Sequence, residues 1–179
     1  MKSIYILLTR TNTFVSRAIY ALTRDKYTHV ALSLDDSFEC LYSFGRKYPR
    51  LALPAGYVKE SIYQGIFGKN GKINCAVYRM EISDGSYVKL KKLLEEMEQD
   101  DTDYQYNLLG LWSCFFGYKW ERETHFFCSE FVAHALSEAE IIEFEKDCSL
   151  IKPMDFSDLS ELTEIFNGNI GELRELNMI

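Results

Sequence analysis

The sequence predicts an α+β protein with a central antiparallel sheet and with helices packed mostly at its sides. Stretches of continuous or alternating apolar residues, typical of strands, are interleaved with stretches in which apolar residues recur at helical spacing. The chain has 179 residues, of which 47% are hydrophobic, and this is enough for a sizeable core without disulfides. We therefore expect a single domain that spans residues 1–179.

The first predicted elements are a strand and a helix. Residues 3–9 form an unbroken run of bulky and β-branched side chains, which predicts a buried strand. Residues 11–13 then offer helix-capping side chains, and apolar residues follow at helical spacing. This pattern predicts a helix that ends at about Thr23.

A β-hairpin is predicted next. Residues 27–34 and 38–44 each alternate apolar with polar side chains, and turn-forming residues separate the two runs. If the bulkier apolar residues of both runs lie on one face of the hairpin, the loop has three residues and Leu34 lies opposite Phe38. This register places Ser43 beside His29.

The middle of the chain is predicted to be a long connection followed by a strand and a helix. Residues 45–71 show little periodicity, apart from a possible short strand near Tyr57 or Ile62. Residues 73–82 alternate like a strand. Ser83 and Asp84 then supply a cap for an amphipathic helix to about Gln99.

Three further helices are predicted in the rest of the chain. Residues 108–117 are very apolar, and we expect a buried helix in preference to a membrane-contacting hairpin. Residues 127–136 have helical periodicity, with Cys128 where the helix begins. A last helix is expected from Ser157 to Phe166, ended by Gly168 and Asn169.

Charge and cysteine content exclude several function classes. Twenty basic and 27 acidic residues give a net charge of −7, which argues against nucleic acid or an anionic membrane as a partner. The N-terminal apolar run is too short for a signal peptide. The five cysteines show no CxxC pair, so neither a disulfide framework nor a zinc site is indicated. We expect a cytoplasmic protein without metal or cofactor; its oligomeric state is left open.

Cys128 is the first candidate for catalysis. A thiol at a helix N-terminus feels unpaired N–H groups and the positive end of the helix dipole, and both favour thiolate over thiol. A free cysteine is also commonly just a small buried apolar residue. A base elsewhere in the chain therefore has to support the catalytic interpretation.

Cysteine hydrolysis needs a histidine base and a third polar group that orients the imidazole. His125 lies on an irregular segment just before Cys128, and His134 falls on roughly the opposite face of the helix. His29 lies in a different predicted element, on the less apolar face of a strand. It is the third candidate for the base.

Four motifs in this order carry a family resemblance: Thr28-His29-Val30-Ala31-Leu32-Ser33-Leu34, Tyr42-Ser43-Phe44-Gly45-Arg46, Tyr106-Asn107-x-x-Gly110-Leu111 and Phe127-Cys128-Ser129-Glu130-Phe131-Val132. Together they resemble the permuted NlpC/P60 family and, within it, the YiiX-like branch of papain-like cysteine hydrolases. The likeness extends from about residue 3 to Asp155. It implies a circularly permuted papain-like fold, with the nucleophile helix packed against the sheet.

The resemblance implies Cys128 as the nucleophile and His29 as the base. The third member in this family is a polar residue on the strand after the histidine strand, where the predicted register places Ser43. Glu39 is the carboxylate alternative and needs another register or a bulge. The oxyanion and substrate pocket would use the backbone N–H of Cys128 together with three side chains, namely Tyr104, Tyr106 and Asn107.

The function expected from the resemblance is cleavage of an amide or peptide bond through a Cys128 thioester. The substrate would be a small peptide or another amide-containing molecule. One alternative is acyl transfer or lipid deacylation, as in the related lecithin:retinol acyltransferase-like branch, although no Asn-Cys-Glu-His stretch occurs at Cys128. The other is an inactive binding module on the same fold.

Overall fold

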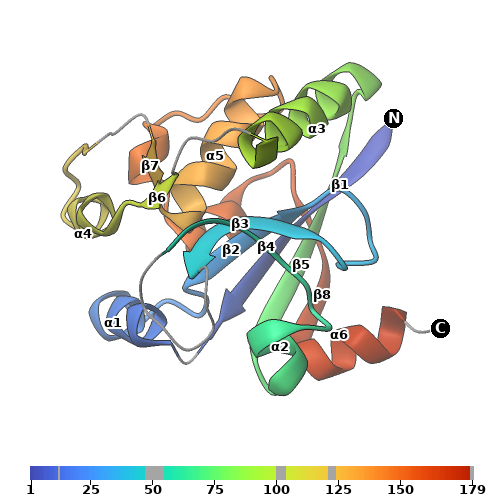
Figure 1. Cartoon of the computed structure of the whole chain (residues 1–179), viewed down its shortest axis with the longest axis horizontal. Coiled ribbons are helices and arrows are strands. Elements are labelled where there is room, and N and C mark those ends of the chain that lie inside the picture. Colours follow the sequence, from blue (N-terminus) through green and yellow to red (C-terminus); the bar gives the residue numbers. More distant parts are fainter. Residues whose placement is uncertain (12, 47–54, 100–103, 121–123, 178–179) are drawn as a thin grey trace. The chain divides into compact units, whose positions relative to one another are not determined.

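A computed structural model describes residues 1–11, 13–46, 55–99, 104–120 and 124–177. Within these ranges the chain is a mixed α+β protein with an eight-stranded sheet, which confirms the predicted class (Figure 1). The strand order is β7-β6-β4-β3-β2-β1-β5-β8. Among the described helices, none is long and apolar enough to span a bilayer.

The chain divides into two compact units, each assembled from three separate segments. Unit 1 comprises residues 1–2, 42–58 and 81–152, and unit 2 comprises residues 3–41, 59–80 and 153–179.

Two antiparallel strand pairs organise unit 2. Strand β1 (Lys2–Arg10) pairs with β2 (His29–Ser33), with Leu7 opposite Ala31 and Thr9 opposite His29. Strand β5 (Asn74–Ile82) pairs with β8 (Thr163–Asn169) through a bulge between Val77 and Tyr78. The strands predicted at residues 3–9 and 73–82 are confirmed as β1 and β5.

Helix α1 (Phe14–Thr23) agrees with its prediction at both ends. The Thr13 hydroxyl caps the helix by accepting a hydrogen bond from the Ser16 N–H at 3.2 Å. Arg24 ends it in the left-handed conformation, with φ of 60°.

The core of unit 2 covers one face of the β1–β2 pair. Its buried residues include Tyr5, Leu7, Ala31, Phe38, Leu41, Ile62, Phe67, Ile73, Cys75, Val77, Ile170 and Leu173. Helix α2 (Gly65–Lys69) contributes Phe67. Burial, together with the nearby Glu172, raises the pKa of the Cys75 thiol to about 12, so this cysteine stays protonated at neutral pH.

The predicted three-residue hairpin loop is wrong. Strand β2 ends at Ser33 and β3 (Leu41–Arg46) begins only at Leu41, so neither Leu34 nor Phe38 lies in a strand. Phe38 adopts a positive φ of 52° and packs edge-on against Tyr5, with ring centroids 5.6 Å apart. Burial of this ring in the core outweighs the period-2 pattern that favoured a strand.

The predicted helix from Ser157 to Phe166 is also wrong. Residues Pro153–Asp158 form a 3₁₀ helix, β8 follows, and the helix α6 (Ile170–Asn177) comes after it. Pairing with β5 holds residues 163–169 extended. The Asn169 side chain accepts from the Glu172 N–H at 3.1 Å, and the Glu172 carboxylate accepts from the Asn169 N–H at 3.0 Å. Asn169 therefore starts a helix through a capping box instead of ending one.

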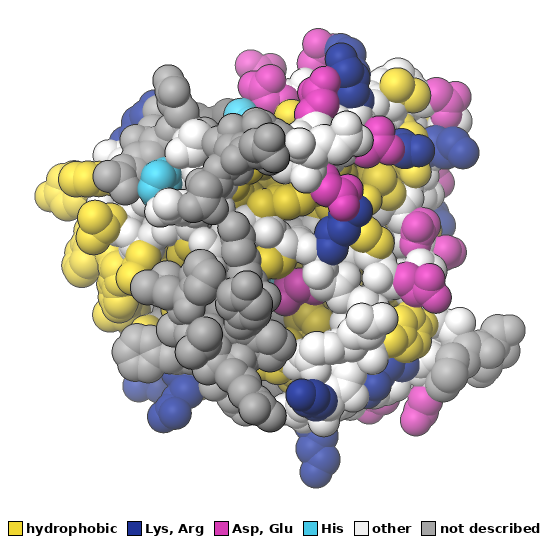
Figure 2. Space-filling model, viewed as in Figure 1, with side chains coloured by type: hydrophobic (Ala, Val, Ile, Leu, Met, Phe, Trp, Pro, Cys, Tyr) yellow, Lys and Arg dark blue, Asp and Glu magenta, His cyan; other side chains and the backbone are white. Residues whose placement is uncertain are grey.

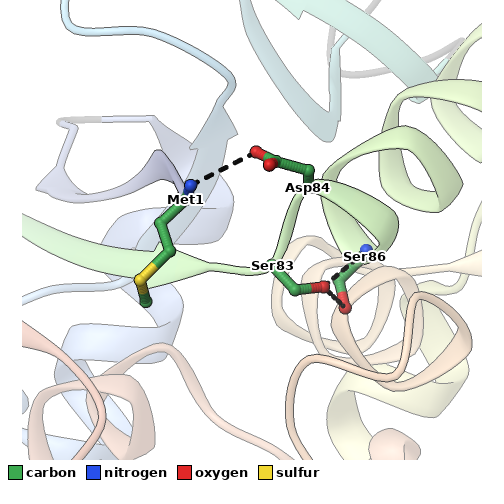
Figure 3. Close-up of polar contacts among 4 residues, drawn as sticks. All are labelled: Met1, Ser83, Asp84 and Ser86. Carbon is green, nitrogen blue, oxygen red and sulfur yellow. Dashed lines mark hydrogen bonds and ion pairs between the residues drawn. The ribbon is translucent and has the colours of Figure 1, made fainter.

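In unit 1, helix α3 (Asp84–Gln99) follows β5 as predicted. Figure 3 shows its start, where the Ser83 hydroxyl accepts from the Ser86 N–H at 3.0 Å. The N-terminal amino group of Met1 lies 3.4 Å from the Asp84 carboxylate in the first turn. This segment confirms the predicted Ser83 cap.

The region predicted as a long connection contains regular structure. Strand β4 (Ala55–Glu60) confirms the short strand near Tyr57, and α2 follows it in unit 2. The part of the predicted connection at residues 47–54 lies outside the described residues.

A parallel strand pair departs from the predicted antiparallel sheet. Strand β6 (Gln105–Tyr106) pairs antiparallel with β4 but parallel with β7 (His125–Phe126). A parallel pair requires a crossover connection, and this one contains α4 (Leu108–Phe115). Helix α5 (Cys128–Glu138) follows β7, and the short 3₁₀ helix Cys148–Leu150 comes after it.

The expectation that residues 108–117 form a buried helix holds for one face only. Gly110, Leu111 and Cys114 are buried. The other side of α4 and the residues after it expose Leu108, Leu109, Trp112, Phe116, Tyr118 and Trp120. Figure 2 shows hydrophobic side chains gathered on the surface over α4, at the left of the view.

Candidate active site

Cys128 is the first residue of α5, as the sequence predicts, and it is 1% exposed. The preceding residue, Phe127, is extended and serves as the N-cap. Its N–H donates to the Glu130 carboxylate at 3.2 Å. Glu130 is 3% exposed and occupies the third helical position, where a carboxylate stabilises the helix start.

The parallel β6–β7 pair brings a second segment to this helix start. Tyr106 lies beside Phe126 in the register, and the Asn107 N–H donates to the Phe126 carbonyl at 2.9 Å. The chain around Tyr106 is therefore fixed by backbone hydrogen bonds to the residues just before Cys128.

The Asn107 side chain joins three parts of unit 1. Its oxygen caps α4 by accepting from the Gly110 N–H at 2.8 Å. Its amide nitrogen donates to the Trp120 carbonyl at 3.2 Å and lies 3.5 Å from the Glu130 carboxylate. A Cβ at position 110 would clash with this amide, so the Asn107 side chain requires glycine three residues later. These contacts favour a positioning role for Asn107 over contact with substrate.

Tyr106 is the predicted oxyanion residue that lies near the thiol. Burial raises the pKa of its phenol well above the ordinary value, and the nearby ionisable groups of Cys128 and Glu130 raise it further. The phenol is therefore neutral and able to donate a hydrogen bond throughout the physiological pH range.

Tyr104 belongs instead to an aromatic cluster that packs α5 onto β3 and β4. Its ring meets that of Phe44 edge-on, with centroids 6.4 Å apart. Phe131 of α5 contacts Phe44 at 5.2 Å and Tyr57 at 5.6 Å, measured between ring centroids. Within unit 1 the helix that carries Cys128 is thus held against the sheet, as expected from the sequence.

The two histidines near Cys128 in the sequence have other contacts. The His134 ring lies 5.2 Å from the Phe126 ring, and the His125 Nδ1 lies 3.0 Å from the Thr124 hydroxyl. Both side chains are half-buried.

His29, in unit 2, has a carboxylate partner that sequence reasoning missed. Its Nε2 lies 3.0 Å from Glu60 Oε2, and the side chains are 16% and 24% exposed. Glu60 ends β4, inside the stretch predicted as a long connection. The available signal was the β-favouring pair Tyr57-Val58 just before it, but no pattern indicated which residue that strand would bring to His29.

Ser43 and Glu39, the two third members considered from the sequence, lie on β3 and in the connection before it. Ser43 is fully buried on β3 in unit 1, while His29 belongs to unit 2. The register argument for Ser43 assumed the three-residue loop, so Ser43 as the third member stays a prediction without that support. Glu39 is exposed in the connection between β2 and β3.

No protein-family model, no curated protein and no solved structure matches this chain.

The Tyr106 phenol can be tested by titration. We expect the folded wild type and Tyr106→Phe to show the same tyrosinate absorbance through the pH range in which ordinary tyrosines ionise, because the folded protein keeps this phenol protonated there. The unfolded chain ionises first, so Tyr106 also costs stability as pH rises above about 10.

The control for this titration is the unfolded protein. In denaturant the two proteins should differ by one phenol that ionises near pH 10, the ordinary value for tyrosine. A difference that already develops around pH 10 in the folded proteins would contradict the burial of this phenol beside Cys128.

Proposed function

We propose that this protein is a cysteine hydrolase that cleaves an amide or peptide bond through a thioester on Cys128, with His29 as general base. The observation that carries the proposal is the His29–Glu60 pair, in which a half-buried carboxylate holds one ring nitrogen at 3.0 Å. The proposal includes a circularly permuted papain-like fold of the NlpC/P60 type.

The Glu60 carboxylate determines which nitrogen of the His29 ring can act as the base. Glu60 can only accept a hydrogen bond, so Nε2 of the neutral ring carries the proton and Nδ1 carries the lone pair. Glu60 also stabilises the imidazolium that forms when Nδ1 takes a proton. This is the role of the third member in a catalytic triad, and it assigns to Glu60 the place considered for Ser43 or Glu39.

The start of α5 supplies the other half of the chemistry. The N–H groups of the first helical turn have no partner within a helix, so the Cys128 N–H is suited to bind a developing oxyanion. The neutral Tyr106 phenol is the second proposed donor. Glu130 and Asn107 hold both groups in place.

The proposed reaction has two steps. His29 takes the Cys128 proton, the sulfur attacks the carbonyl carbon, and the amine leaves with the proton from His29. Water then attacks the thioester, His29 accepts a proton from that water, and the C–S bond breaks. The sulfur recovers the proton, and a carboxylic acid is released.

A short bifunctional reagent tests whether Cys128 and His29 act together. In a Cys40→Ser/Cys148→Ser background, which removes the two half-exposed thiols, we expect 1,3-dibromoacetone to link Cys128 to His29. Peptide mass spectrometry would identify the linked pair. Cys75 should not react at neutral pH because its pKa is about 12.

The control is His29→Ala treated with iodoacetamide, where alkylation of Cys128 shows that small reagents reach this buried thiol. If Cys128 is alkylated but never linked to His29 in the wild type, the proposed pairing is wrong.

Variants of three residues test which one orients His29. We expect Glu60→Gln to slow acylation of Cys128 by p-nitrophenyl acetate about 10²-fold or more, because the ring loses its anionic partner. Glu60→Asp should keep part of the rate. The matched controls are Glu39→Gln and Ser43→Ala, which should stay near the wild-type rate. A large loss in either control with a small loss in Glu60→Gln would reverse the assignment.

The exposed face of α4 favours a second candidate function, acyl transfer or lipid deacylation. Leu108 and Leu109 directly follow Asn107, and they begin a surface with further exposed apolar residues at Trp112 and Phe116. A surface of this kind suits a long acyl chain.

We expect the second candidate to show itself as a stable acyl thioester. With p-nitrophenyl palmitate, intact-protein mass spectrometry would find the palmitoyl group on Cys128, and Leu109→Ser would reduce its formation while leaving acetylation unchanged. Absence of the palmitoyl adduct where the acetyl adduct forms favours the amide hydrolase. A protein that forms neither adduct fits an inactive binding module.

A further inference from the structure

Helix α4, in unit 1, carries apolar side chains on its exposed face as well as on its buried one. At about 100° per residue, Leu108, Leu109, Trp112 and the C-cap residue Phe116 fall within an arc of about 100°. The buried residues of α4 lie on the other side of the helix. A helix that rests on a core normally turns polar or charged residues outward, and one that is apolar all round is normally covered.

Two further aromatic residues extend this exposed face. The Tyr118 N–H donates to the Ser113 carbonyl at 2.9 Å, which holds Tyr118 at the last turn of α4. The Trp120 carbonyl accepts from the Asn107 amide at 3.2 Å, which returns the chain to the start of the helix. We call the six residues the α4 apolar surface (Figure 2). They are between 37% and 71% exposed, and they are Leu108, Leu109, Trp112, Phe116, Tyr118 and Trp120.

Charged groups border the α4 apolar surface and are absent from its centre. The chain has 27 acidic residues among 179, yet residues 104–120 include none. The one basic residue of this stretch, Lys119, pairs with Asp147 at 2.5 Å. The Lys152 ammonium lies over the Phe115 ring, 5.6 Å from its centroid. The cover of this surface therefore meets apolar and aromatic groups in the middle and ammonium groups at the border.

The size and chemistry of the surface argue against a second copy of the chain as its cover. A whole aromatic side chain has about 150–250 Å², so the four exposed rings offer roughly 350–550 Å². The two half-exposed leucines leave the total below the about 800 Å² that a stable dimer buries on each partner. Protein interfaces also need about one hydrogen bond per 100–200 Å², and the exposed arc of α4 offers a single indole N–H.

We propose that the α4 apolar surface docks on a neutral phospholipid membrane, lying in the interface without crossing it. Leu109 and Phe116 enter the boundary between headgroups and acyl chains. Tyr118 and Trp120 each have an apolar body and a polar tip, which suits the headgroup level. The bordering lysines reach the phosphates. The net charge of −7 disfavours anionic lipid, so the surface fits phosphatidylcholine. This docking is independent of the proposed catalytic function.

The fluorescence of the protein reports on this surface directly. The chain has two tryptophans, Trp112 and Trp120, and both belong to the α4 apolar surface. With phosphatidylcholine vesicles we expect the emission to move to shorter wavelength and the protein to float with the vesicles in a density gradient. Phosphatidylcholine brominated on its acyl chains should quench the emission, because quenching requires contact with the bromine atoms.

Variants locate the contact. We expect Leu109→Ser/Phe116→Ser to lower the vesicle partition coefficient on the order of tenfold or more, because two apolar side chains no longer leave water on docking. Its melting temperature should stay near that of the wild type, since both positions are exposed. The matched control is Leu22→Ser/Val88→Ser, which removes two exposed apolar side chains from other helices and should bind like the wild type.

The outcomes separate docking from the alternatives. An emission that does not change with neutral vesicles, or equal binding by Leu109→Ser/Phe116→Ser and the wild type, would overturn the proposal. A shift without vesicles that grows with protein concentration, with a dimer in sedimentation velocity, would assign the surface to a second copy instead. Binding that needs phosphatidylglycerol and is lost in salt would show a purely electrostatic contact and would also contradict it.

The catalytic proposal and the docking proposal can fail separately. Cys128→Ala should bind phosphatidylcholine vesicles like the wild type, because the thiol is buried and lies outside the α4 apolar surface. Vesicle binding by a protein that forms no acyl thioester would support docking and count against the cysteine hydrolase alone.

Discussion

The buried carboxylate of Glu130 is the contact on which the candidate nucleophile depends. It accepts the N–H of Phe127 and lies within reach of the Asn107 amide, so the start of α5 and the segment before α4 are tied to one group. A buried charge is stable only when hydrogen bonds satisfy it, and this requirement fixes both segments together. Asn107 in turn needs Gly110, and the β6–β7 register places Tyr106 near Cys128.

The two carboxylates discussed here have different physical roles. Glu130 is almost fully buried and bonds to main-chain and amide N–H groups, so it holds structure. Glu60 is partly exposed and contacts the His29 ring, so it can orient that ring. In the proposed mechanism the first positions the nucleophile and the oxyanion donor, and the second sets the tautomer of the base.

Features that lower stability or solubility occur in both units, next to candidate catalytic residues. Thr9 and Ser129 leave buried hydroxyls unpaired beside His29 and Cys128, and α4 exposes apolar side chains just after Asn107. Elsewhere the local rules are kept, as in the caps at Thr13 and Asn169. Natural proteins tend to break such local rules at functional sites, so these departures are compatible with the proposed roles of the neighbouring residues.

Local signals in the sequence determined many of the helices and strands of this protein. Continuous apolar runs and capping residues were enough to predict β1, α1, β5, α3 and the start of α5 at Cys128, because these elements follow from interactions between near neighbours. Tertiary structure alone decided the rest. Phe38 left its strand pattern to fill the core, residues 163–169 became a strand because β5 offered an edge, and β4 brought Glu60 to His29. Each of these depends on a partner distant in sequence, and a periodic pattern carries no information about which partner that will be.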